Sequence, residues 1–162
     1  MERVIARQMY EHLKAHDILH RAQHGFCNGR STCTNVLESV NDWTLSIEYK
    51  HSVKVACVDF SKSFDSVSHE KLFVRLASYK IRRNLLQWLR EYFSERTHQT
   101  RVGFAFSVVI ELLSGVVQGS GIGPLLFLSY INELAKILER AGVTVQLFAD
   151  DVKLYMEIVN DM

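Results

Sequence analysis

The chain has 162 residues, of which 48% are apolar and 23% are charged, and its formal net charge is +1. This length and composition are typical of one globular domain with a buried core, and they exclude a disordered chain. A net charge so close to zero does not by itself indicate any class of partner.

The three cysteines, Cys27, Cys33 and Cys57, form no even disulfide framework, which favours a reducing compartment. No signal peptide opens the chain, and no apolar run is long enough to span a membrane. We therefore expect an intracellular protein of the nucleus, the cytoplasm or both, with no membrane among its partners.

The first fifty residues are predicted to form two helices joined by a loop. Apolar residues repeat at helical spacing between residues 2 and 16. A connection with two glycines follows over residues 16–30, and Ser31 or Thr32 then caps the second helix. Val36, Val40, Trp43 and Ile47 are expected to lie on one face of this second helix.

The same loop carries four potential metal ligands, His20, His24, Cys27 and Cys33. Their spacing does not match the usual structural zinc patterns, and loops often hold histidine and cysteine for other reasons. An ordinary loop is therefore the favoured interpretation, with a zinc site as the alternative.

Residues 53–60 form a near-continuous apolar run, which predicts a strand in a sheet that is covered on at least one face. The run ends on Asp59. Two helices are predicted to follow, the first capped by Ser68 and the second over residues 85–93. Their apolar faces are expected to consist of Leu72, Leu76 and Tyr79 in the first, and Leu85, Trp88, Leu89, Tyr92 and Phe93 in the second.

Positive charge is concentrated in these two helices. Between Lys71 and Arg101 there are eight lysines or arginines against two glutamates. Such a stretch can follow a phosphate backbone, or it can form the solvated face of two helices, and the sequence leaves both open. The candidate contacts to nucleic acid are Arg82, Arg83 and Arg90.

Residues 100–106 and 108–113 are predicted to pair as a hairpin. The segment that follows has four glycines in nine residues and then Pro124, which predicts a loop that closely approaches a ligand and opens a helix. This helix is expected to run to about Arg140 and to stop at Gly142. The glycine loop matches neither the P-loop nor the dinucleotide-binding pattern.

The last stretch predicts a β-hairpin, with strands over residues 143–148 and 152–158 and with Asp150 and Asp151 at or beside the turn. For this acidic pair alone, a solvated turn is the simpler interpretation. However, the earlier apolar strand also ends on an aspartate, Asp59. Two strands that both deliver carboxylates at their ends predict a shared metal site.

Taken together and in this order, these stretches resemble the reverse transcriptases of non-LTR (LINE-like) retrotransposons. The resemblance is carried by Val-Asp-Phe-Ser-Lys-Ser-Phe-Asp at 58–65, Gly-Val-Val-Gln-Gly-Ser at 115–120, Gly-Pro-Leu-Leu-Phe at 123–127 and Phe-Ala-Asp-Asp at 148–151. Gln-His-Gly-Phe at 23–26 and Gly-Arg-Ser-Thr at 29–32 are similar to a fingers segment of that branch. The resemblance covers essentially the whole chain.

The resemblance implies an α+β fold. Residues 51–162 would be a polymerase palm, with a small antiparallel sheet packed on helices, and residues 1–50 a partial fingers segment. Together they would form the core of one truncated reverse transcriptase domain, an RNA-directed DNA polymerase that joins a dNTP to the 3′-hydroxyl of a DNA primer on an RNA template.

Such a reaction is an in-line phosphoryl transfer, in which catalysis is positioning and charge neutralisation. By resemblance, Asp59, Asp150 and Asp151 are the catalytic carboxylates. Together with the main-chain carbonyl of Phe60 they are the expected ligands of two Mg²⁺ ions, for which Mn²⁺ is an alternative.

The resemblance also assigns the nucleotide contacts. Phe64 matches the bulky aromatic residue that leaves no room for a 2′-hydroxyl and so selects deoxynucleotides. Gln118 and Gly119 match the glutamine–glycine pair that lies against the incoming nucleotide. Asp65 matches a recurrent acid, which we expect to hold local structure instead of metal.

Two positions depart from the family pattern: Val117 stands where a proline is usual, and Cys27 where an arginine is common. The strand that grips the triphosphate, a later palm motif, the primer grip and the thumb are expected to be absent. The alternative function is therefore a catalytically inactive, retrotransposon-derived remnant that binds nucleic acid. A palm-type RNA polymerase is disfavoured by Phe64, because RNA synthesis needs space for the 2′-hydroxyl.

Overall fold

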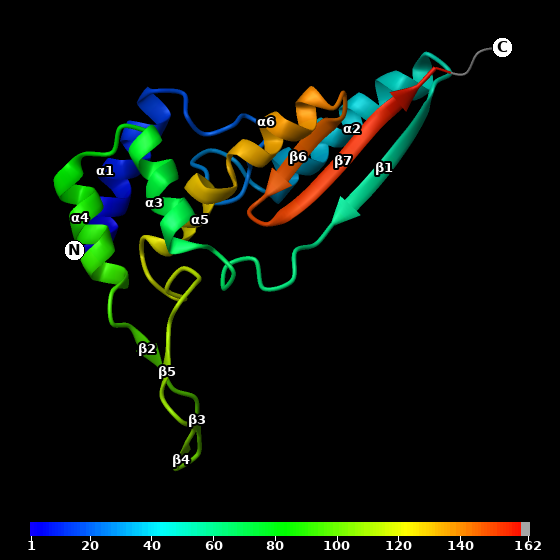
Figure 1. The fold of residues 1–162 in the computed structure, drawn as a ribbon. Helices are drawn as coiled ribbons and strands as arrows, with labels where there is room; N and C mark the ends of the chain where they lie inside the picture. Colours follow the sequence, from blue (N-terminus) through cyan, green and yellow to red (C-terminus); the bar gives the residue numbers. More distant parts are fainter. Residues whose placement is uncertain (160–162) are drawn as a thin grey trace.

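The computed structural model describes residues 1–159 and combines a group of helices with a small sheet (Figure 1). The helices are α1 (Glu2–Ala15), α2 (Thr32–Glu48), α3 (His69–Ser78), α4 (Arg83–Phe93), α5 (Gly123–Ile131) and α6 (Glu133–Arg140). The strands are β1 (Ser52–Val58), β2 (Thr97–His98), β3 (Arg101–Val102), β4 (Ala105–Phe106), β5 (Ile110–Glu111), β6 (Thr144–Phe148) and β7 (Asp151–Ile158). The predicted α+β class is confirmed.

The main sheet is antiparallel, in the order β1-β7-β6, with β7 at its centre. Its register pairs Val58 with Val152 across β1 and β7, and Phe148 with Asp151 across β6 and β7. The loop before α2 extends the sheet by a short parallel bridge, in which the amide of His24 donates to the carbonyl of Leu147 at 2.9 Å. The loop after α1 is therefore fixed to the outer edge of β6.

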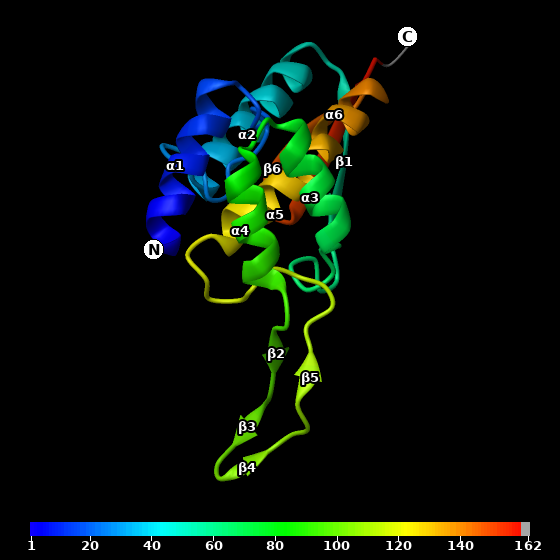
Figure 2. The ribbon, with the colours of Figure 1, turned by 60° about the vertical axis from the view of Figure 1, so that its left-hand side comes forward.

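The larger hydrophobic core lies among α1, α3, α4 and α5, which gather on the side away from the β1 edge of the sheet (Figures 1 and 2). The apolar spacing of α1, α3 and α4 predicted this core in part, because Met9, Leu13, Leu72, Leu76 and Leu89 are all buried. A second, smaller cluster joins one face of the sheet to α6 through Ala135, Val145, Leu147 and Val152.

Of the four apolar residues expected on one face of α2, only Trp43 packs against the sheet, with its ring centroid 5.8 Å from that of Tyr155. Ser31 caps the helix as expected, accepting a hydrogen bond from the amide of Thr34. Val36, Val40 and Ile47 are exposed, whereas the buried residues of the helix are polar: Asn35, Ser39 and Ser46. The sheet presents polar groups of β7 on this side, so it selects the hydrogen-bonding face of the helix over the apolar one.

The first predicted strand is more exposed than its apolar run suggests. Residues 52–58 do form β1, but every one of them except Val53 is exposed. The strand lies at the edge of the sheet and pairs only with β7 within residues 1–159. An edge strand has one neighbour, so apolar side chains such as Val55 and Val58 stay accessible.

The predicted hairpin over residues 100–113 has a different register. Two short ladders form, β2 with β5 and β3 with β4, and the turn falls at Gly103, whose φ is +62°. A glycine adopts this left-handed conformation without steric cost, so the turn forms there and not between residues 106 and 108. The resulting arm, residues 97–111, is exposed along its whole length and extends away from the helices (Figure 2).

The segment predicted as one helix from Pro124 to Arg140 is divided at Asn132 into α5 and α6, although Asn132 itself has helical dihedral angles, φ −53° and ψ −33°. The buried side-chain amide of Asn132 accepts a hydrogen bond from the backbone amide of His20 and donates to the carbonyl of Ile18, so it holds the loop after α1 against this point. The predicted stop is confirmed, since α6 ends at Arg140 and Gly142 has a φ of +81°. Within residues 1–159, no helix combines the length and apolar character needed to cross a bilayer.

The rotation of α2 can be tested by substituting neighbouring residues on its two faces. Ser39→Leu places a large side chain at a fully buried position, and we expect the free energy of unfolding to fall by about 1–3 kcal/mol. Val40→Ser changes an exposed position and should alter it by less than about 0.5 kcal/mol. Urea denaturation measures both, and the reverse order would show that Val40 faces the sheet.

Candidate active site

The turn between β6 and β7 carries the acidic pair. Because Phe148 pairs with Asp151, the loop contains only Ala149 and Asp150, and Asp151 is the first residue of β7. Ala149 has a φ of +56°, whereas Asp150 is not among the residues with a positive φ. A residue with a Cβ in this left-handed region costs about 1–2 kcal/mol. Asp150 is half-buried and Asp151 is exposed.

Asp59 follows β1 directly. The last pair of β1 and β7 joins Val58 to Val152, and Asp59 and Asp151 line one cavity. The structure therefore places the three predicted carboxylates at one end of the sheet. None of them takes part in an ion pair within residues 1–159.

The three carboxylates are not preassembled around one point. Among the described residues, no group of three or more His, Cys, Asp or Glu side chains forms a metal site. Asp150 instead accepts a hydrogen bond from the hydroxyl of Ser63. The fourth expected ligand is the carbonyl of Phe60, a residue that is 38% exposed. The zinc alternative at His20, His24, Cys27 and Cys33 is likewise not assembled.

Two loops that are distant in the sequence meet beside this end of the sheet. The amide of Gly115 donates to the carbonyl of Val67, and the hydroxyl of Ser114 donates to the carbonyl of Asp65, both at 2.8 Å. Gly115 has a φ of +88°, and a side chain there would meet the backbone of Asp65 at 2.8 Å. The loop after β1 and the glycine-rich loop are therefore held together as one surface.

The predicted nucleotide contacts lie on this surface. The amide of Gln118 donates to the carboxylate of Asp65 at 3.1 Å, which agrees with the local structural role expected for Asp65. Gly119 is exposed, and its φ of +76° suits a glycine. The ring of Phe64 stacks on that of Phe127 with centroids 4.0 Å apart, so the buried Phe127 fixes its orientation.

A cavity of about 650 Å³ lies between these loops and the base of the arm. Gln118 and Asp65 line it, together with the basic side chains of Lys62 and Arg96. Arg96 lies over the ring of Tyr92 at 4.1 Å, so its guanidinium is held in place. The sequence analysis counted Arg96 among the basic residues but did not connect it, or Lys62, with Gln118.

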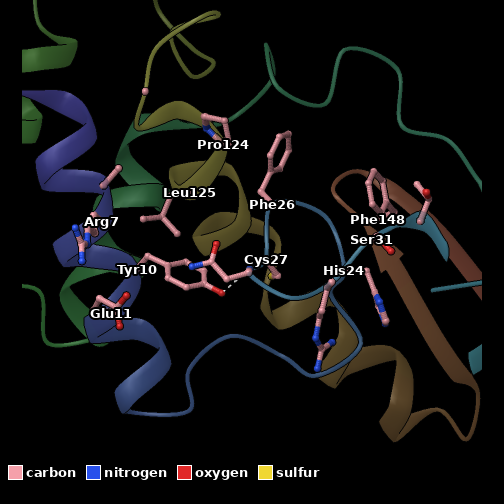
Figure 3. A pocket seen from close by; sticks show the side chains of 15 residues that line it. Arg7, Tyr10, Glu11, His24, Phe26, Cys27, Ser31, Pro124, Leu125 and Phe148 are labelled. Carbon is pink, nitrogen blue, oxygen red and sulfur yellow. Dashed lines mark hydrogen bonds between the residues drawn. The ribbon is translucent and has the colours of Figure 1, made fainter. Parts of the chain in front are cut away.

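A larger cavity of about 950 Å³ lies beside Phe148, between α1, the loop before α2 and the start of α5 (Figure 3). Arg7 and Tyr10 line it from α1, and Phe26 and Arg30 from the loop. Phe26 is 56% exposed, so its ring is open to a ligand. The sequence analysis did not find this combination of basic and aromatic side chains, because it is assembled from separate segments.

The candidate nucleic-acid contacts of α4 lie elsewhere. Arg82, Arg83 and Arg90 are exposed, but α4 stands on the far side of the helical group from the β6–β7 turn (Figure 1). Arg90 lies over the ring of Phe73 at 4.5 Å and so contributes to packing. The structure does not bring these arginines to the carboxylates.

Behind the sheet, α2 contacts β7 through a polar network. The ammonium of Lys153 donates to Asn35 at 3.3 Å and to Ser39 at 3.2 Å, and the hydroxyl of Tyr155 donates to Asp42. Burial raises the pKa of Tyr155, and the Asp42 carboxylate raises it further. Lys153 also lines a cavity of about 260 Å³ with Asp59 and Asp151, so this network reaches the carboxylates.

His24 is a buried ionisable group beside the same sheet. It is 1% exposed; its Nδ1 lies 2.8 Å from the hydroxyl of Thr34 and its Nε2 3.3 Å from the carboxylate of Glu38. Burial lowers the pKa of His24, and the nearby Glu38 carboxylate opposes this effect without cancelling it. The imidazole of His24 therefore stays neutral to a lower pH than that of a free histidine.

Comparison with known protein families identifies one match over almost the whole chain. The model of the family described as reverse transcriptase (RNA-dependent DNA polymerase) matches residues 1–161. The sequence-based resemblance to this family is therefore confirmed.

Individual relatives have names of the same kind. The chain is 25% identical over 164 residues to a probable RNA-directed DNA polymerase from transposon BS of Drosophila melanogaster, covering 94% of this chain and 17% of that protein. It is 27% identical over 165 residues to a retrovirus-related Pol polyprotein from type-1 retrotransposable element R2 of Popillia japonica, covering 95% of this chain and 23% of that protein. The chain thus spans about a fifth of the length of these relatives.

The burial of His24 predicts a dependence of stability on pH. The unfolded chain takes up the proton more readily than the folded one, so the stability due to neutral His24 is complete above pH 6.5, its ordinary pKa, and is lost as the pH falls below that value. We expect the urea midpoint to fall less in His24→Gln than in the parent when the pH is lowered from about 7.5 to about 5.5.

The matched control is His98→Gln, which removes an exposed histidine of the arm. This variant should show the same fall as the parent. An equal fall in His24→Gln and the parent would show that His24 does not contribute to the pH dependence.

Proposed function

Because the chain belongs to the reverse transcriptase (RNA-dependent DNA polymerase) family, we propose that it carries the nucleotidyl-transfer site of an RNA-directed DNA polymerase. Its substrates would be a dNTP and the 3′-hydroxyl of a DNA primer paired with an RNA template. Residues 51–162 would serve as the palm and residues 1–50 as part of the fingers. The shared core of α1 with α3, α4 and α5 supports treating both as one unit.

The observation that carries this proposal is the arrangement of carboxylates at one end of the sheet. Asp150 lies in the turn, Asp151 begins β7, and Asp59 directly follows β1, whose last pair joins Val58 to Val152. Like charges brought together by backbone pairing repel one another, so they favour a bound cation. The absence of an ion pair to any of the three within residues 1–159 leaves their oxygens available as ligands.

The donor set fits Mg²⁺, which prefers hard oxygen ligands. Asp59, Asp150 and Asp151 would hold the metal, with the carbonyl of Phe60 as a further ligand. Two such ions, or Mn²⁺ in their place, would activate the primer hydroxyl and stabilise the leaving pyrophosphate. The hydroxyl of Ser63 orients Asp150, and the two-residue turn fixes the separation of Asp150 from Asp151.

The cavity beside Gln118 suits the incoming nucleotide. Lys62 and Arg96 would attract its phosphates, and Gln118, oriented by Asp65, would contact the nucleotide with Gly119 beside it. Phe64, held by its stack on Phe127, would close the space where a 2′-hydroxyl would lie. Basic side chains would thus contact the phosphates, and the ring of Phe64 would limit the space beside the sugar.

The larger cavity, beside Phe148, suits a single-stranded template. Arg7 and Arg30 can bind phosphates, and the exposed ring of Phe26 can stack on a base, a combination typical of single-strand binding. Arg82 and Arg83 lie at the N-terminus of α4, where the helix dipole disfavours positive charge. With Arg90 they would contact the nucleic acid away from the reacting atoms.

The first test is extension of a DNA primer on an RNA template with Mg²⁺ and dNTPs. We expect Asp59→Asn, Asp150→Asn and Asp151→Asn each to reduce extension by about 100-fold or more, because each removes a charged oxygen ligand. Asp17→Asn is the matched control, since Asp17 is an exposed aspartate of the loop after α1. It should extend the primer as the parent does.

Two results would contradict this function. Undiminished extension by Asp150→Asn would show that the carboxylates are not the catalytic groups. Binding of the primer–template by the parent without metal-dependent extension would support the alternative, an inactive remnant that binds nucleic acid.

A second test concerns the choice of sugar. We expect Phe64→Ala to lower the preference for dNTP over rNTP by about tenfold or more, because removal of the ring opens space for the 2′-hydroxyl. The ratio of the two kcat/KM values measures the preference and does not depend on the fraction of folded protein. Phe73→Ala, which removes a buried ring of α3, should leave the ratio unchanged. An unchanged ratio in Phe64→Ala would exclude Phe64 from sugar selection.

A further inference from the structure

The segment Gln23-His24-Gly25-Phe26 reaches the catalytic turn through one side chain. Gln23 is 3% exposed, and its side-chain amide makes three hydrogen bonds. Its Oε1 accepts from the amides of Gly25 at 2.8 Å and Ala149 at 2.9 Å, and its Nε2 donates to the carbonyl of Ala149 at 3.1 Å. Both backbone groups of Ala149 are therefore bonded to the same side chain.

The orientation of this amide is unambiguous. Two backbone N–H groups point at one of its terminal atoms, so that atom is the oxygen. The other atom faces a carbonyl, so it is the nitrogen. Residues 22–24 pair with β6 through backbone hydrogen bonds. The side-chain amide of Gln23 has an acceptor and a donor side by side, as a backbone peptide does, and it continues this pairing to Ala149.

These contacts act on the peptide unit that precedes Asp150. The carbonyl of Ala149 belongs to the peptide plane that joins Ala149 to Asp150, so the bond from Gln23 fixes the direction in which Asp150 leaves the turn. Gly25 makes this approach feasible, because a side chain at that position would come within 2.2 Å of the nitrogen of Ala149. Ala149 itself is 6% exposed and is held in the left-handed region that alanine disfavours.

We propose that Gln23 is a positioning residue for Asp150: its amide clamps the backbone of Ala149 in the left-handed conformation and so sets the carboxylate of Asp150 for its role in the site. The effect of Gln23 on catalysis rests on the proposed function. Its hydrogen bonds to Ala149 do not depend on that function. Gln23 does not touch the reacting atoms. Its effect passes through Ala149.

The clamp requires an amide. A glutamate at residue 23 would lose the donor and place a negative charge beside the acidic turn, and an asparagine would be one methylene too short to reach both groups of Ala149. A methionine has the right length and neither hydrogen-bonding group. Gln23→Met therefore removes the clamp with the least change in packing.

Asn132 offers a matched control. It is also 3% exposed, and its amide also makes three hydrogen bonds, to the amide of His20, the carbonyl of Ile18 and the hydroxyl of Tyr79. None of these partners belongs to the turn. Asn132→Leu thus removes an equally buried amide and should reproduce any general loss of stability.

The first measurement is amide hydrogen exchange by NMR on the full chain. We expect Gln23→Met to accelerate exchange of the Ala149 amide by about 30-fold relative to core amides, since two hydrogen bonds to Ala149 are lost. Asn132→Leu should change Ala149 only as much as it changes the core. Equal acceleration at Ala149 in both variants would overturn the clamp.

A measurement on the parent protein covers the case in which Gln23→Met does not fold. The side-chain NH₂ of Gln23 should exchange at least about tenfold more slowly than that of Gln8, which is exposed on α1, because the former is buried and bonded. Equal exchange of the two side chains would show that Gln23 is not bonded to Ala149, and the proposal would fail without any variant.

The catalytic part is tested by Mn²⁺ binding, followed by electron paramagnetic resonance of the free ion, and by primer extension. We expect Gln23→Met to weaken Mn²⁺ binding by about tenfold and to lower kcat with little change in the KM for dNTP. Adding Ala149→Gly should recover about fivefold of this loss, because glycine adopts a positive φ without help. If Ala149→Gly gives no such recovery, and Asn132→Leu is equally impaired per folded molecule, Gln23 contributes only to packing.

The two proposals fail in different ways. If the parent neither binds Mn²⁺ nor extends a primer while the exchange results are as expected, the proposed function fails and Gln23 remains the clamp of the turn. If the parent extends the primer and Gln23→Met extends it equally well per folded molecule, the function stands and the positioning role fails.

Discussion

The two-residue loop between β6 and β7 forces a residue with a side chain into the left-handed region, and the rest of the site is arranged around that constraint. Ala149 has a φ of +56°, which costs about 1–2 kcal/mol. Burial and the two hydrogen bonds between Ala149 and the side-chain amide of Gln23 offset this cost. Asp150 and Asp151 follow directly, so the turn sets their positions. Because β7 pairs with β1, the position of the turn also determines where Asp59, the residue after β1, lies relative to Asp151.

The packing of α2 on the sheet shows a second use of polar contacts. Its buried face meets the sheet through hydrogen bonds of Asn35 and Ser39 with Lys153, and of Asn35 with the carbonyl of Leu147. Hydrogen bonds are directional, so they fix the helix along and around its axis more narrowly than apolar contact would. The same network places Lys153 in the cavity that Asp59 and Asp151 line. The helix that supports the sheet thereby also contributes to the surroundings of the carboxylates.

The sequence alone determined the positions of the three carboxylates relative to their strands. Apolar runs that stop at Asp59 and at Asp150 define strand ends, because short apolar runs of this kind usually form paired strands. Caps such as Ser31 and Ser68 and the stop at Gly142 were also readable, because each depends on backbone groups only a few residues away. The family followed from these motifs in their order, and the match over residues 1–161 agrees with it.

Tertiary structure decided what lies against these elements. Periodicity does not reveal which face of α2 meets the sheet or that β1 lies at the sheet edge, because both depend on distant partners. The clearest case is Gln23, whose amide meets Ala149 across 126 residues of sequence. The residues near a helix end or a strand end decide its local conformation, whereas the choice of buried face and the pairing of a distant amide with a strained turn depend on how the whole chain packs. For this reason the sequence located the carboxylates, and only the folded chain revealed what holds them.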